Sequence, residues 1–124
     1  MSLASHRRRS SSAIDAVPIL ADLLDLLWRA GHRSHLWATL GLCGLVLGDL
    51  GEDALAVQIR SWVSSAQLAM PPLPADAVAI KAQSQQLVEQ HDEAWVDRQS
   101  ALAASWTTES AIATVRGALQ RQLD

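Results

Sequence analysis

The chain has 124 residues, a length that fits one domain, and a net charge of −3. Apolar residues make up 49% of it, and its aromatic residues are five tryptophans, with no Phe or Tyr. Ala and Leu are strong helix formers, and no β-branched residues alternate with polar ones, so we predict an all-α fold. Three of the ten basic residues are Arg7–Arg9. The rest of the chain is therefore acidic, which argues against nucleic acid as a partner.

The predicted elements begin after a polar segment rich in Ser and Arg. We predict a disordered basic tail over residues 1–13 and a single helical domain over residues 14–124. The first helix is expected to start near Asp15, which can cap it. Pro18 then falls in the first turn, where backbone N–H groups lack helical partners. Gly31 is expected to end this helix in the left-handed conformation that suits glycine.

The second helix, expected over residues 34–47, combines an apolar face with a row of glycines. The apolar residues recur at helical spacing; they are Leu36, Leu40, Cys43 and Leu47. Gly41, Gly44 and Gly48 line one side. Each glycine inside a helix costs roughly 0.5–1 kcal/mol, a cost that is typical where another helix backbone comes close. We therefore predict a tightly packed antiparallel hairpin with the next helix.

A short turn at residues 48–51 leads to the third helix, for which Asp49 and Glu52 fit a capping box. Its apolar side holds Leu55, Ile59, Trp62, Val63 and Ala66. The prolines that follow stop this helix and stiffen the chain. We thus expect helical hairpins over residues 14–70 and a proline linker over residues 71–74.

Residues 75–124 are expected to hold a long helix and a C-terminal helix. The fourth helix, over residues 74–106, is polar with a narrow apolar stripe. Thr107 or Thr108 can cap the last helix, although the two helices could also be one helix that bends near Thr107. The total is about five helices.

No catalytic or cofactor signature stands out in the sequence. His32 and His35 could bind a metal, but structural zinc usually takes four ligands. His91 could move protons, although a partly buried, hydrogen-bonded histidine is the simpler interpretation. Cys43 lies on an apolar face, which favours a buried, inert thiol. A helix-turn-helix is disfavoured because its second helix would begin with the acidic Glu52. We expect no catalytic residue, no cofactor and no metal.

A membrane-spanning segment is not expected either. The longest uncharged run through the second helix, residues 34–48, has about 15 residues, short of the ~20 that cross a bilayer. Asp15, Asp22 and Asp25 interrupt the apolar segment that follows the arginines, unlike a signal peptide. We therefore expect a cytoplasmic protein.

Residues 31–63 resemble a helical repeat motif and a family of small helical proteins related to it. Trp37, Leu40 and Gly41 stand at the spacing of the tetratricopeptide repeat, as does Gly48. The same stretch resembles the tetratricopeptide-like chaperones of bacterial type III secretion needle proteins. The features that match these chaperones are Gly31, His35, Ala38, Leu50-Gly51, Ala54 and Ile59-Arg60.

In that chaperone family the concave hairpin surface sequesters an amphipathic helix of the needle subunit. The resemblance implies that hairpin residues partly line such a groove; these are Leu36, Leu40, Leu47, Leu55 and Trp62. Trp95 and Trp106, on the narrow stripe of the polar helix, are candidate anchors because Trp is enriched at interfaces.

The functional hypothesis is a non-catalytic adaptor or chaperone that captures an amphipathic helix of a partner protein. A secretion system is one setting for it. The first alternative is a homo-oligomeric assembly subunit that self-associates through the long helix. The second is a small helical enzyme or metal-binding protein.

Overall fold

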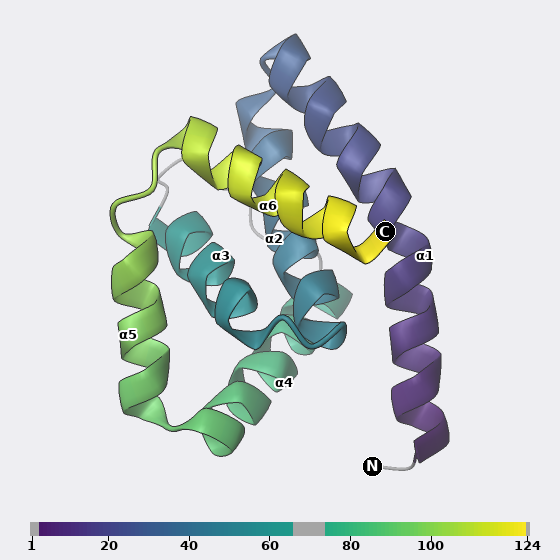
Figure 1. The fold of residues 1–124 in the computed structure, drawn as a ribbon, viewed down its shortest axis with the longest axis vertical. Helices are drawn as coiled ribbons and strands as arrows, with labels where there is room; N and C mark the ends of the chain where they lie inside the picture. Colours follow the sequence, from purple (N-terminus) through teal and green to yellow (C-terminus); the bar gives the residue numbers. More distant parts are fainter. Residues whose placement is uncertain (1–2, 66–73, 124) are drawn as a thin grey trace.

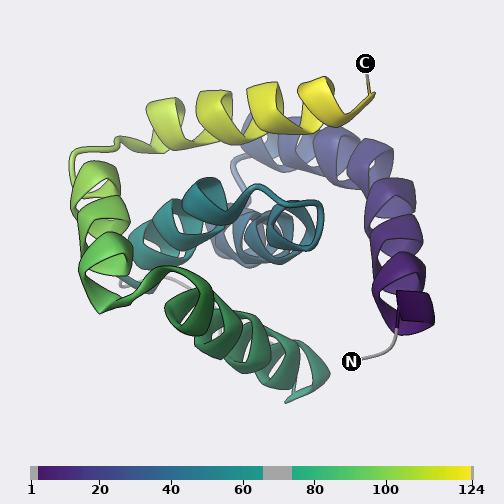
Figure 2. The ribbon, with the colours of Figure 1, turned by 60° about the horizontal axis from the view of Figure 1, so that its bottom comes forward.

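A computed structural model describes the backbone of residues 3–65 and 74–123, and the side chains of residues 13–32, 35–65 and 77–123. All of the regular structure in these residues is helical, which confirms the all-α prediction. The helices are α1 (Leu3–Ala30), α2 (Arg33–Asp49), α3 (Asp53–Ser65), α4 (Pro74–His91), α5 (Glu93–Ala103) and α6 (Thr108–Leu123). Figures 1 and 2 show the α2–α3 hairpin at the centre, with the other helices arranged around it.

Helix α1 begins at Leu3 rather than near Asp15, so Pro18 lies inside the helix and not in its first turn. The segment predicted as a disordered tail, residues 1–13, is therefore helical from Leu3 onward. Its Ala and Arg residues favour helix, and an internal proline removes one backbone hydrogen bond without ending the helix here.

The end of α1 confirms the role predicted for Gly31, whose φ is +74°. The Gly31 N–H donates to the Trp28 carbonyl at 3.3 Å, and the His32 N–H donates to the Leu27 carbonyl at 3.1 Å. This pair of bonds is a Schellman motif, in which a left-handed glycine lets the chain satisfy the last helical carbonyls. The chain then turns sharply into α2.

The turn between α2 and α3 differs from the predicted capping box. Asp49 is the last residue of α2, and α3 starts at Asp53. The Glu52 N–H donates to the Leu47 carbonyl at 2.9 Å, and Gly51 has a φ of +94°. A second Schellman motif therefore closes this turn, and the prediction that Asp49 caps α3 is wrong.

The predicted long polar helix over residues 74–106 is two helices, which brings the described helices to six. The break is at Asp92, a non-glycine residue with a φ of +111°. Its carboxylate accepts a hydrogen bond from the Trp95 N–H at 2.8 Å, so it caps α5. Backbone strain of this kind costs on the order of 1–3 kcal/mol, and the cap offsets part of it.

The start of α6 confirms Thr107 as a cap. Its Oγ1 accepts a bond from the Ser110 N–H at 3.1 Å, and Ser110 Oγ accepts one from the Thr107 N–H at 2.8 Å. The two residues form a reciprocal capping box in which serine takes the place of the usual Glu. Helices α5 and α6 are therefore separate. The rest of the proline linker, residues 71–73, lies outside the described residues.

The glycine row of α2 explains how closely the central helices pack. A Cβ built on Gly44 would lie 3.1 Å from Ile59 Cγ2 of α3, and one on Gly48 would lie 2.6 Å from the amide carbon of Gln83 in α4. Gly41 has no such neighbour within 4 Å. The predicted approach of another helix backbone is thus confirmed only at Gly44, where the Ala56 carbonyl oxygen of α3 would lie 3.8 Å from the added Cβ; at Gly48 the space is filled by the Gln83 side chain.

The main hydrophobic core lies where α1, α2, α3 and α6 meet. It contains Val17, Leu20, Leu24, Leu36, Trp37, Leu40, Cys43, Leu47, Leu55, Ile59, Ile112, Val115, Ala118 and Leu119. A second, smaller cluster formed by Ala56, Val57 and Leu87 joins α3 to α4, with two residues of α5 packed against it. None of the described helices is long and apolar enough to cross a bilayer.

Candidate protein-binding cleft

The leucines predicted to line a partner groove are part of the main core; they are Leu36, Leu40, Leu47 and Leu55. Each is less than a tenth exposed, because the first and last helices of the chain, α1 and α6, pack against the hairpin. The expectation that they face a partner is therefore corrected: the chain's own helices occupy this surface.

The three tryptophans predicted to bind a partner pack against different clusters: Trp62 and Trp106 against the main core, and Trp95 against the second cluster. Trp62 and Trp106 meet, since the indole N–H of Trp62 donates to the Trp106 carbonyl at 3.1 Å. The Trp62 ring also packs against Trp37, with 5.0 Å between ring centroids. Trp95 lies apart from them, half-buried against the second cluster. Trp62 and Trp106 thus join α3 to the α5–α6 connection.

His91 joins three helices. Its Nε2 lies 2.8 Å from Asp53 Oδ2 of α3, and its ring stacks on Trp95 of α5 at 3.9 Å between centroids. This agrees with the interpretation of a partly buried, hydrogen-bonded histidine. The rings of His32 and His35 are 6.2 Å apart in an edge-on arrangement. In the described part of the chain, no three His, Cys, Asp or Glu side chains are grouped to hold a metal ion.

The candidate site is a cleft of about 240 Å³ between α3, α4 and α5. Figure 2 shows α4 and α5 meeting at an angle around α3. Val57 and Leu87 are buried in its floor, Val96 is half-buried, and Val88 is 37% exposed at its edge. Four serines of the described residues also line the cleft; they are Ser61, Ser64, Ser84 and Ser100. Apolar and hydroxyl-bearing side chains therefore both line the cleft, and the most buried of them are apolar.

Among the described residues that line this cleft, Arg60 is the one cation. Its guanidinium donates to the Ser84 hydroxyl and, at 2.9 Å, to Gln83 Oε1. The Gln83 amide, only 7% exposed, in turn donates to the Leu45 carbonyl of α2 at 2.9 Å. Burial lowers the pKa of Arg60 from its usual value, because desolvation disfavours the charged form. The network fixes a partly desolvated positive charge in the wall of the cleft.

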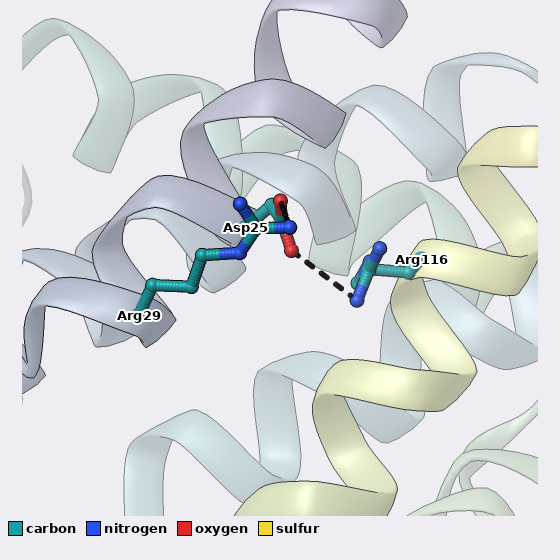
Figure 3. Close-up of polar contacts among 3 residues, drawn as sticks. All are labelled: Asp25, Arg29 and Arg116. Carbon is teal, nitrogen blue, oxygen red and sulfur yellow. Dashed lines mark ion pairs between the residues drawn. The ribbon is translucent and has the colours of Figure 1, made fainter.

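A second, wider hollow of about 440 Å³ lies between α1 and α6. Two of the charged residues that line it, Asp25 and Arg116, are paired at 3.5 Å, and Asp25 also lies 2.9 Å from Arg29 (Figure 3). Such exposed ion pairs contribute little, about 0–1 kcal/mol each. Small residues line most of the remainder, including Ala21 and Gly117. This hollow therefore offers less apolar surface for a ligand than the cleft does.

Sequence reasoning missed the cleft because its parts come from three helices. Two of its valines, Val57 and Val96, lie outside the apolar stripes that the periodicity picked out. Only the break at Asp92 turns α5 back toward α3. Arg60 carried no usable signal, although it directly follows the core residue Ile59, because adjacent residues of a helix face different directions.

Comparisons with known proteins give no relative for this chain. No family model matches it, no curated protein matches its sequence, and no solved structure matches its fold.

The thiol of Cys43 gives a pH-dependent prediction. It is fully buried, and burial raises its pKa from 9.0 to about 12. Above pH 9 the unfolded state therefore loses the thiol proton while the folded state keeps it, so stability falls as pH rises from 9 toward 12. We expect the free energy of unfolding to be about 1 kcal/mol lower at pH 10 than at pH 8 from this group.

Urea denaturation at the two pH values measures that loss. The chain has no tyrosine, which removes the commonest competing titration. In Cys43→Ala the difference in the free energy of unfolding between pH 8 and pH 10 should be smaller by about 1 kcal/mol than in the wild-type chain. This holds whatever the variant's own stability is. If the variant and the wild-type chain showed the same difference, the pKa of the Cys43 thiol would not be raised in the folded state.

Proposed function

We propose that this chain is a non-catalytic adaptor or chaperone that binds an amphipathic helix of another protein in the cleft between α3, α4 and α5. The combination of buried apolar side chains and serines in the lining of the cleft is the observation that carries the proposal. An amphipathic helix matches this pattern, because its apolar face can bury against the valines while its polar flanks meet the serines.

The size of the cleft supports a docked side chain over a small-molecule substrate. Pockets for small molecules typically enclose about 300–1,000 Å³ and surround most of the ligand. A cleft of about 240 Å³ is smaller than that. It suits one or two apolar side chains of a segment that otherwise lies across the surface.

The resemblance of residues 31–63 to needle-protein chaperones supports a helix as the bound element. The proposed surface differs from the one that the resemblance implies, because α1 and α6 cover the leucines of the hairpin. A cytoplasmic location and a secretion-system setting belong to the proposal.

A displayed library of amphipathic peptides, about four turns long with apolar residues at helical spacing, tests the proposal directly. We expect the chain to enrich peptides that bind it, with affinities measured by fluorescence anisotropy. Val88→Glu, which places a charge at the cleft, should weaken their binding at least tenfold, or about 1.4 kcal/mol.

The matched control is Val78→Glu, the same change on the same helix at a residue that is 71% exposed and outside the cleft. It should leave binding unchanged, and both variants should keep the helical circular dichroism spectrum. Failure to enrich any peptide would contradict the proposal. Equal losses of peptide affinity in Val88→Glu and Val78→Glu would also contradict it. So would light scattering that shows a dimer in the wild-type chain and a monomer in Val88→Glu, because a second copy of the chain would then cover the cleft.

A further inference from the structure

We infer that Arg60 makes the cleft selective for a partner segment that carries a carboxylate beside its apolar anchor. This inference rests on the proposed function and adds a chemical requirement to it. The partner would place an apolar side chain over the floor and an Asp or Glu side chain against the guanidinium.

The geometry of Arg60 is suited to such a contact. Its bonds to Ser84 and Gln83 hold the guanidinium at the wall of the cleft, and the Gln83 amide is itself anchored to the Leu45 carbonyl. A guanidinium has further N–H donors in one plane, which match the two oxygens of a carboxylate. The group is therefore held in place before a ligand arrives.

Some other basic side chains of the described residues have an acidic partner. Arg116 pairs with Asp25, and His91 pairs with Asp53. None of the ion pairs among the described residues includes Arg60. Asp49 contacts the same network, with its Oδ1 3.4 Å from the Gln83 amide nitrogen.

A helix that binds over the cleft would raise the desolvation free energy of the Arg60 guanidinium. The helix would remove water from the guanidinium, and an uncompensated buried charge is strongly unfavourable. A partner with only apolar and neutral groups must bear that desolvation cost, whereas a partner carboxylate offsets part of it by forming a charge-assisted pair. Arg60 would thus both attract acidic segments and disfavour neutral ones.

The test uses a peptide enriched by the wild-type chain and a second peptide in which its acidic residue beside the anchor is changed to the neutral amide. We expect the acidic peptide to bind about tenfold more tightly, with the difference shrinking at high salt. Arg60→Gln should remove this preference. Arg60→Lys should keep part of it, because lysine keeps the positive charge but lacks the planar set of N–H donors. Arg98→Gln, the same change at an exposed residue of α5 outside the cleft, should keep all of it.

The outcomes separate this inference from the proposed function. Peptides that bind at the cleft with equal affinity in acidic and neutral forms would overturn the inference and leave the docking site in place. A failure to enrich peptides would overturn both. The comparison of the two peptides on the wild-type chain needs no variant, so it remains decisive even where Arg60→Gln fails to fold.

Discussion

Replacing Leu40 with alanine is expected to lower the free energy of unfolding by about 3 kcal/mol. The side chain is 1% exposed and belongs to the main core, where α1 and α6 close over the α2–α3 hairpin. Removing its buried methyl groups loses their transfer free energy and leaves a cavity that helices on several sides cannot fill together. Urea denaturation followed by circular dichroism at 222 nm measures the change.

Leu26→Ala is the matched control, because it makes the same substitution at a residue of α1 that is 63% exposed. We expect it to cost less than about 0.5 kcal/mol. Similar small losses for both variants would mean that the hairpin leucines are not enclosed by the chain. They would then be free to meet a partner, as the sequence alone suggested.

The leucines of α2 show what helical periodicity can and cannot predict. The spacing of Leu36, Leu40 and Leu47 correctly predicted a helix and the face that it buries. The same spacing carries no information about what covers that face, since a partner helix and the chain's own α1 or α6 would select the same residues. This is why the core was predictable while the assignment of these leucines to a groove was not.

Local signals predicted the helix ends where one residue type decides the geometry. Gly31 and Thr107 act through their own backbone or hydroxyl group, so their roles could be read from short sequence patterns. The break at Asp92 has no such signal, because helix-forming residues flank it on both sides. It depends on contacts across the fold, including the bond between His91 and Asp53, and these become visible only in three dimensions.

Two alanine substitutions in the glycine row of α2, Gly41→Ala and Gly44→Ala, are expected to differ by about 2 kcal/mol in the free energy of unfolding. Gly41→Ala should raise the free energy of unfolding by about 1 kcal/mol, because alanine favours helix and the new methyl meets no atom within 4 Å. Gly44→Ala gains the same helix propensity. Its methyl, however, would lie 3.1 and 3.3 Å from Cγ2 and Cβ of Ile59.

Ile59 cannot move aside easily, because it is buried in the main core and its Cβ is fixed to the α3 backbone. Overpacking of this kind costs about 1–3 kcal/mol, which exceeds the propensity gain, so Gly44→Ala should be destabilised by about 1 kcal/mol. Thermal and urea unfolding of the two variants, side by side, measure the difference. Equal stabilisation of both would mean that α2 and α3 are further apart than this packing requires. The glycines would then need an explanation other than helix contact.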